Sequence, residues 1–218
     1  MFPALYAILD SSPEFSSESA LSIPEIALRL VEGGVELFQY RDKRGSARRI
    51  QQNSQLLSDQ LGAKRIRIIV NDRADIAAMT GAGGVHVGQE DLPVEESRKI
   101  CRAPLWVGVS THNLEQLRAA GASSADYIAV GPIFPTGTKA NPDPIVGLEF
   151  LRAARKVTRK PLVAIGGITV ESAGDVYQAG ADSIAVIRDL MFANDPAQRA
   201  REYIAIAKRV VPARPARN

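Results

Sequence analysis

Residues 162–187 read LVAIGGITVESAGDVYQAGADSIAVI, and their pattern sets the expectation for the rest of the chain. An apolar run rich in branched side chains, Leu162–Ile165, precedes a helical pattern over Ser172–Ala179 and a second apolar run over Ser183–Ile187. Two short apolar runs separated by a helix are typical of parallel strands joined by a crossover. The stretch therefore predicts one strand–helix–strand unit.

The same alternation recurs along the whole chain. There are eight strand candidates: Leu5–Leu9, Val35–Tyr40, Arg67–Val70, Gly84–Val87, Leu105–Val109, Tyr127–Val130, Leu162–Ile165 and Ser183–Ile187. Eight helix candidates follow them in turn: Pro24–Glu32, Ala47–Leu61, Arg73–Met79, Val94–Ile100, Leu114–Ala120, Leu148–Val157, Ser172–Ala179 and Pro196–Arg209. Eight units with nothing left over favour a closed (β/α)8 barrel, or TIM barrel. An open doubly wound sheet is the alternative, but the Gly-x-Gly-x-x-Gly motif of dinucleotide-binding sheets does not follow the first strand.

The composition is that of an ordinary globular protein. The chain has 218 residues, of which 45% are hydrophobic and 23% charged, and we expect one domain over residues 1–218 with a loose basic tail from about residue 211. The formal charge is only +3 and the charges are interspersed, so we infer no nucleic-acid binding. No apolar run reaches the roughly 18 residues that cross a bilayer, and the N-terminus reads as a strand, not a signal peptide. A single cysteine, Cys101, fits a reducing compartment, so we expect a cytoplasmic protein that does not bind membranes.

Polar residues gather directly after seven of the eight predicted strands, where barrel enzymes carry their active sites. These clusters are Gln39-Tyr40-Arg41-Asp42-Lys43, Asn71-Asp72, Gly88-Gln89-Glu90-Asp91, Ser110-Thr111-His112, the stretch from Gly131 to Lys139, Gly166-Gly167-Ile168, and Arg188. Seven clusters at the same relative position predict one site at the carboxyl ends of the strands.

Two of these clusters carry groups that suit phosphates. Gln39, Arg41 and Lys43 share one side of an extended chain, and a guanidinium beside an ammonium suits a diphosphate. The alternative for this cluster is a solvated surface charge run. The segment Thr136-Gly137-Thr138-Lys139 offers two hydroxyls, backbone N–H groups and an ammonium, which can surround a phosphate unless the segment is only a flexible loop.

Asp72 and Asp91 follow adjacent predicted strands, the third and the fourth. Carboxylate oxygens together with substrate phosphates are the usual ligands of Mg²⁺. Asp72 also directly precedes a predicted helix, so a helix cap explains it equally well. The two histidines, His86 and His112, have no neighbours that would form a catalytic triad or a zinc site, and we expect neither to act as a general base.

Taken together, six segments closely resemble the thiamine-phosphate synthase family, in the family's order and over nearly the whole chain. They are Phe38–Lys43, Ile69–Arg73, Val85–Leu92, Gly108–His112, Val130–Lys139 and Ala164–Thr169. The most specific are Gly-Gln-Glu-Asp at 88–91 and Gly-Pro-Ile-Phe-Pro-Thr-x-Thr-Lys at 131–139. The resemblance implies a TIM-barrel transferase. It would condense 4-amino-2-methyl-5-(diphosphooxymethyl)pyrimidine with a (carboxy)thiazole ethyl phosphate, giving thiamine phosphate and diphosphate through Mg²⁺-assisted dissociative loss of diphosphate.

The resemblance also implies roles for individual residues. The pyrimidine diphosphate would be bound by Gln39, Arg41, Lys43, Asn71, Ser110 and Lys139, and Tyr40 and Asp42 would also belong to the substrate-binding residues. The catalytic residues among these would be Arg41, Lys43, Ser110 and Lys139. The thiazole phosphate would be bound by Thr136, Gly137, Thr138, Gly167, Ile187 and Arg188, and Mg²⁺ by Asp72 and Asp91.

One position departs from the family. Arg188 stands where the family usually has a serine, and it could either bind phosphate or turn away to pair with Asp189. Two alternative functions stay open: a thiazole tautomerase of the sister family, which lacks the full diphosphate-binding set, and a non-catalytic barrel that binds a phosphorylated ligand. We also expect the long loop from Gly131 to Gly147 to close over the site and exclude water.

Overall fold

The computed structural model describes residues 2–12, 15, 21–62, 64, 66–137 and 143–210. The predicted basic tail from about residue 211 therefore lies outside the described residues, as do Thr138 and Lys139. The strands are β1 (Leu5–Asp10), β2 (Leu37–Arg41), β3 (Arg67–Asn71), β4 (Gly84–Val87), β5 (Trp106–Thr111), β6 (Tyr127–Val130), β7 (Leu162–Ile165) and β8 (Ser183–Val186). The helices are α2 (Ile23–Glu32), α3 (Ala47–Gly62), α4 (Ala74–Met79), α5 (Val94–Ile100), α6 (Leu114–Ala122), α7 (Gly147–Val157), α8 (Val170–Gln178), α9 (Arg188–Met191) and α10 (Pro196–Val210).

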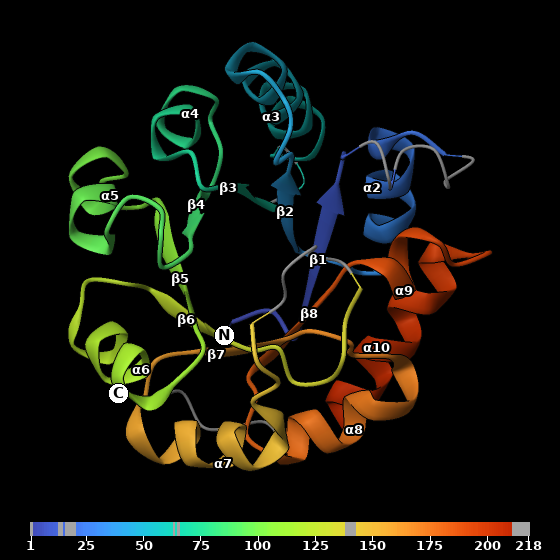
Figure 1. Cartoon of the computed structure of the whole chain (residues 1–218). Coiled ribbons are helices and arrows are strands. Elements are labelled where there is room, and N and C mark those ends of the chain that lie inside the picture. The colour runs from blue at the N-terminus through green and yellow to red at the C-terminus, as the bar shows by residue number, and fades with distance from the viewer. Residues whose placement is uncertain are drawn as a thin grey trace.

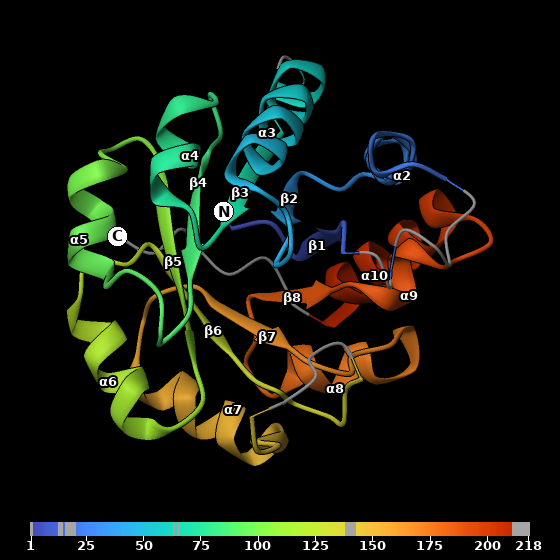
Figure 2. The ribbon, with the colours of Figure 1, turned by 45° about the horizontal axis from the view of Figure 1, so that its top comes forward.

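The eight strands form a closed, parallel barrel in the order of the sequence. The barrel closes where β1 pairs with β8, in a register that matches Leu5 with Ile184 and Ala7 with Val186. The longer helices surround the strands as an outer ring (Figure 1), and the same arrangement is seen from a second direction in Figure 2. The predicted (β/α)8 barrel is confirmed, and the open-sheet alternative is wrong.

The barrel has an outer and an inner set of packed residues, because side chains alternate between the two faces of each strand. The outer set packs the strands against the helices. The inner set fills the barrel and consists of Tyr6, Ile8, Leu37, Ile69, Tyr127, Ala129, Val163 and Ala185. At the amino ends of the strands the ring of Phe2 stacks on Trp106, with centroids 5.2 Å apart, and the Arg67 guanidinium lies 3.9 Å from the Trp106 ring centroid. These residues close that end of the barrel, which leaves the other end for a site.

One element was not among the predicted helices. The four-residue helix α9 directly follows β8, and it is too short to produce a hydrophobic periodicity in the sequence. Among the described residues no helix is both long and apolar enough to cross a membrane.

Candidate active site at the carboxyl ends of the strands

A cavity of about 1230 Å³ opens at the carboxyl ends of the strands, with wall residues from all eight strands or the loops that follow them. Most of the predicted site residues line it: Gln39, Arg41, Lys43, Asn71, Asp72, Asp91, Ser110, Thr136, Gly137, Gly167, Ile187 and Arg188. The fold thus brings together residues that are as far apart in the sequence as β2 and β8. The predicted contacts of Thr138 and Lys139 fall outside the described residues.

Two predicted site residues face the other way. The Tyr40 hydroxyl lies 2.9 Å from Ser11 Oγ and accepts a hydrogen bond from Asn53 on α3. The Asp42 carboxylate accepts two hydrogen bonds from the Arg49 guanidinium, also on α3, at 2.7 and 2.8 Å. Because side chains alternate along an extended chain, the odd members of the 39–43 cluster line the cavity and the even members hold β2 to α3.

Arg41 is held in the cavity wall by a residue that the sequence analysis did not select. The carboxylate of Asp10, at the end of β1, is fully buried and accepts a hydrogen bond from the Arg41 guanidinium. Asp10 also accepts from the backbone N–H of Ser12 at 2.9 Å. An aspartate ending the first strand was the signal that could have identified it, since carboxyl ends of barrel strands carry functional groups.

Asp72 adopts a backbone conformation that is uncommon for residues other than glycine, with φ of 61°. Its N–H donates to the backbone carbonyl of His86 at 2.8 Å, which ties the end of β3 to β4. Helix α4 takes Arg73 as its N-cap residue and has no side-chain cap, so Asp72 does not cap this helix. The carboxylate is directed instead to Lys43, whose ammonium group contacts it.

Asp72 and Asp91 form a pair of neighbouring carboxylates at the cavity wall. Burial raises the pKa of Asp72, the Lys43 ammonium lowers it, and the nearby Asp91 carboxylate raises it further. Asp91 also accepts from the Gly88 N–H at 2.7 Å. Two neighbouring carboxylates repel each other, and a divalent cation bound between their oxygen atoms would relieve this repulsion. No cluster of three or more His, Cys, Asp or Glu ligands occurs within the described chain. A Mg²⁺ ion held here would therefore take its other ligands from phosphate oxygens and water, as is usual for this ion.

A continuous run of hydrogen bonds, here called the interior chain, crosses the barrel between two cavity residues. Gln39 Nε2 donates to the Tyr6 hydroxyl at 2.9 Å, and the Tyr6 and Tyr127 hydroxyl oxygens lie 3.0 Å apart. Tyr127 lies 3.0 Å from His86 Nδ1, and His86 Nε2 lies 2.9 Å from Ser110 Oγ. Tyr6, Tyr127 and His86 were not among the predicted site residues, because bonds between distant strands leave no pattern in the sequence.

The opposite wall of the cavity is built from backbone at the ends of β7 and β8. Gly166 and Gly167 have φ values of +103° and +64°, a region that favours glycine. A Cβ on Gly167 would lie 2.4 Å from the Pro135 carbonyl oxygen, so only glycine fits between the two loops. The Arg188 guanidinium lies 4.8 Å from the ring centroid of Phe192 and 5.4 Å from that of Phe15.

A family model described as thiamine monophosphate synthase matches residues 5–190 of the chain. The chain belongs to this family. A thiamine-phosphate synthase of Koribacter versatilis is 50% identical over 204 residues, covering 94% of this chain and 95% of the relative. One of Methanospirillum hungatei is 41% identical over 179 residues, covering 82% and 87%. The solved structure of a thiamine phosphate pyrophosphorylase from Pyrococcus furiosus superposes with a TM-score of 0.80 at 31% identity, covering 95% of this chain and 96% of that chain.

The sequence left two directions open for the Arg188 side chain, toward a phosphate or toward Asp189. Arg188 lines the cavity and stacks on an aromatic pair, since Phe15 and Phe192 are themselves parallel with centroids 5.7 Å apart. The neighbouring Asp189 accepts from the Tyr203 hydroxyl at 2.5 Å and pairs with Arg199 at 3.3 Å. The charge of Arg188 therefore lies at the cavity wall, while Asp189 has Tyr203 and Arg199 as partners.

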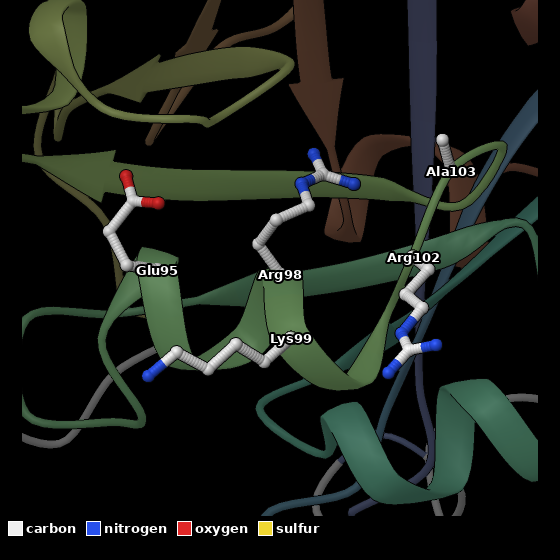
Figure 3. Close-up of a pocket in the computed structure, with 5 residues that line it drawn as sticks. All are labelled: Glu95, Arg98, Lys99, Arg102 and Ala103. Carbon is white, nitrogen blue, oxygen red and sulfur yellow. The ribbon is translucent and has the colours of Figure 1, made fainter.

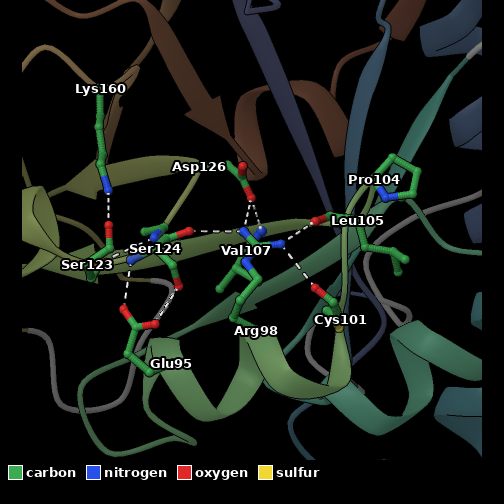
Figure 4. A network of polar contacts seen from close by, with 12 residues as sticks. Glu95, Arg98, Cys101, Pro104, Leu105, Val107, Ser123, Ser124, Asp126 and Lys160 are labelled. Atoms are coloured by element: carbon green, nitrogen blue, oxygen red, sulfur yellow. Dashed lines mark hydrogen bonds and ion pairs between the residues drawn. The ribbon is translucent and has the colours of Figure 1, made fainter.

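A second, shallower hollow of about 440 Å³ lies beside α5, and its lining residues are Glu95, Arg98, Lys99, Arg102 and Ala103 (Figure 3). Two of its four charged residues, Glu95 and Arg98, hold neighbouring segments of the fold together (Figure 4). Arg98 donates to the backbone carbonyls of Cys101 and Leu105 and pairs with Asp126. Glu95 accepts from the N–H and hydroxyl of Ser124 at 2.7 and 2.8 Å. These contacts tie α5 to the segments preceding β5 and β6, and the residues of this hollow do not line the larger cavity.

Proposed function

We propose that this member of the family is a thiamine-phosphate synthase that joins the aminopyrimidine methyl diphosphate to the thiazole phosphate and releases diphosphate. The observation that carries the proposal is that Arg41, Lys43 and the pair of Asp72 and Asp91 line one cavity. A guanidinium, an ammonium and two carboxylates beside each other suit a magnesium diphosphate.

Departure of diphosphate is the demanding step, because negative charge develops on the leaving group. Arg41 and Lys43 would neutralise that charge, and fixed donors of this kind stabilise a transition state strongly in a closed cavity. Bound at Asp72 and Asp91, Mg²⁺ would supply further neutralisation as a Lewis acid. A dissociative step needs no protein nucleophile, so Gln39 and Ser110 have only to hold the ring.

The thiazole phosphate would bind on the opposite wall. The cavity there is lined by Thr136 and by backbone at Gly167 and Ile187, which can present a hydroxyl and N–H groups to a phosphate. Thr138 and Lys139 keep the roles drawn from the sequence, at the thiazole phosphate and the diphosphate respectively. Closure of the loop after β6 over both substrates would protect a carbocation from water.

Two other functions account less well for the residues of this cavity. A thiazole tautomerase does not need a diphosphate site, so that function would not explain why Arg41, Lys43 and the carboxylate pair line the cavity. A non-catalytic barrel would bind both phosphorylated compounds without turnover. We further propose Mg²⁺ as the cofactor, small-molecule substrates without a nucleic-acid or membrane partner, one domain over the whole chain, and a cytoplasmic location.

The test is a direct assay of thiamine phosphate formation from both substrates, with Mg²⁺ and with a chelator. We expect product that depends on Mg²⁺ and is lost in the double variant Asp72→Ala, Asp91→Ala. The control is Asp59→Ala, Asp175→Ala, which removes two exposed carboxylates from α3 and α8. Folded protein that binds both substrates without forming product would contradict the proposed synthase and favour a ligand-binding role.

A further inference from the structure

The direction of the interior chain follows from counting protons. A tyrosine hydroxyl has one proton to donate. The Tyr6 hydroxyl accepts from Gln39, and its other hydrogen-bond partner among the described residues is Tyr127. Tyr6 must therefore donate to Tyr127, because its buried proton would otherwise have no acceptor, which is unfavourable. Burial raises the pKa of both tyrosines, and both hydroxyls keep their protons.

The direction continues through the histidine. Tyr127 accepts from Tyr6, so its own proton goes to Nδ1 of His86. An imidazole whose Nδ1 accepts carries its proton on Nε2. That nitrogen lies 2.9 Å from Ser110 Oγ, so His86 donates to Ser110. The proton of the Ser110 hydroxyl is then directed away from His86.

The two ends of the interior chain consequently offer opposite groups to the cavity. Gln39 turns its NH₂ group toward Tyr6, which leaves its side-chain oxygen, an acceptor, for a ligand. Ser110 accepts from His86, which leaves its O–H, a donor, for a ligand. Reversing either end would require reversing every bond between them, because each hydroxyl carries a single proton.

We propose that Tyr6, Tyr127 and His86 are positioning residues that fix this polarity and thereby select the substrate ring. An acceptor at Gln39 and a donor at Ser110 fit a ring with an amino group and an unprotonated ring nitrogen. A ring with an oxo group and a ring N–H should bind more weakly. Its oxo oxygen and its N–H would leave two acceptors or two donors facing each other at Gln39 and Ser110. The inference rests on the proposed function, in which that ring is the aminopyrimidine.

The test compares two ligands on one variant. Tyr127→Phe removes the central hydroxyl and keeps a ring that packs against Phe2 and Tyr6, with centroids 5.2 and 5.9 Å away. Calorimetry gives the dissociation constants of the aminopyrimidine diphosphate and of its analogue with an oxo group in place of the amino group. We expect the ratio of the two dissociation constants, which favours the amino compound in the wild type, to fall by about tenfold in Tyr127→Phe. This is the size of effect expected when one hydrogen bond to the ligand is lost.

The matched control is Tyr177→Phe, which removes another buried hydroxyl, one that donates to the Ala4 carbonyl at 2.8 Å outside the interior chain. Its ratio of dissociation constants should equal that of the wild type. A Tyr127→Phe variant that binds both ligands more weakly by the same factor would overturn this inference but leave the proposed function standing. A wild-type protein that binds neither ligand would overturn the proposed function and this inference with it.

A second measurement reads the interior chain in the wild-type protein, so it does not depend on the folding of Tyr127→Phe. The sequence contains two histidines, so the ¹⁵N signals of His86 can be assigned by comparison with a His86→Asn protein. We expect the tautomer with its proton on Nε2. The Nδ1–H tautomer would reverse the interior chain and overturn the inference. Tyr6→Phe should shift the ligand ratio as Tyr127→Phe does, and the double variant should add little, because both changes break the same chain.

Discussion

Arg41 and Asp10 are direct register partners on the neighbouring strands β2 and β1, and the guanidinium of Arg41 donates to the carboxylate of Asp10. The Asp10 side chain is fully buried and that of Arg41 is 14% exposed, so each charge depends on the other for compensation. The pair therefore fixes the guanidinium at the wall where the diphosphate is proposed to bind.

Asp10→Asn should lower the stability of the ligand-free protein by about 3 kcal/mol, because it leaves the Arg41 charge buried without a partner. A diphosphate ligand should restore part of this loss, since it supplies the missing negative charge. Urea unfolding with and without the pyrimidine diphosphate measures both effects. Ser12→Ala is the control, because it removes only a hydroxyl bond to the same carboxylate. Equal urea midpoints for Asp10→Asn and wild type would contradict the prediction.

Asp72→Asn should stabilise the metal-free protein at neutral pH and abolish its response to Mg²⁺. Burial raises the pKa of Asp72 in the folded state, so the folded protein takes up a proton more readily than the unfolded chain. Stability therefore falls as pH rises from the unfolded pKa through the folded pKa, and the loss is complete above it. Asparagine removes that loss and tolerates the positive φ.

The measurement is thermal unfolding of wild type and Asp72→Asn at pH 7 and at pH 3. A gain of 1 kcal/mol corresponds to about 2–4 °C for a chain of this size. The gain should be present at pH 7 and absent at pH 3, where the carboxyl is protonated in both states. Mg²⁺ should raise the melting temperature of the wild type only. A variant that melts lower than wild type at pH 7 would indicate that the ion pair with Lys43 outweighs burial.

Arg188→Ser should raise the KM for the thiazole phosphate by about tenfold and leave the KM for the pyrimidine diphosphate unchanged. The Arg188 guanidinium lines the cavity and lies 4.8 Å from the Phe192 ring centroid and 5.4 Å from that of Phe15, within the range of a cation–π interaction. Arg188→Lys keeps the charge without the planar stacking and should give an intermediate value. Steady-state kinetics with each substrate varied in turn makes the comparison. An unchanged KM for the thiazole phosphate would show that Arg188 serves only the packing of its aromatic neighbours.

Gly167→Ala should destabilise the protein by about 1–3 kcal/mol and weaken thiazole phosphate binding. The reason is steric, since a Cβ there would meet the Pro135 carbonyl in a backbone region that alanine avoids. Gly174→Ala, within α8, is the control; its nearest contact would be an ordinary 3.9 Å, and it should gain up to about 1 kcal/mol from helix propensity. Denaturant unfolding and ligand titration of both variants provide the measurements. Similar stabilities for the two variants would contradict the steric argument.

Some residues of the cavity can be predicted from the sequence, and others cannot. Residues that follow strands could be assigned to the site from the chain order alone, because parallel strands bring their carboxyl ends to one edge. The alternation along the strand already places Gln39, Arg41 and Lys43 on one side, and the structure directs Tyr40 and Asp42 to the other. Their contacts with α3 become visible only when the helix is packed on the strand.

The order of residues along the chain is enough to predict the number and order of the strands, their parallel direction and the end of the barrel that carries polar groups. These properties depend on local periodicity and on short connections, which are written along the chain. The hydrogen bonds between Arg41 and Asp10 and between Tyr6 and Tyr127, two residues 121 positions apart, become apparent only in the folded barrel. Such contacts depend on barrel closure and strand register, so no local pattern in the sequence records them.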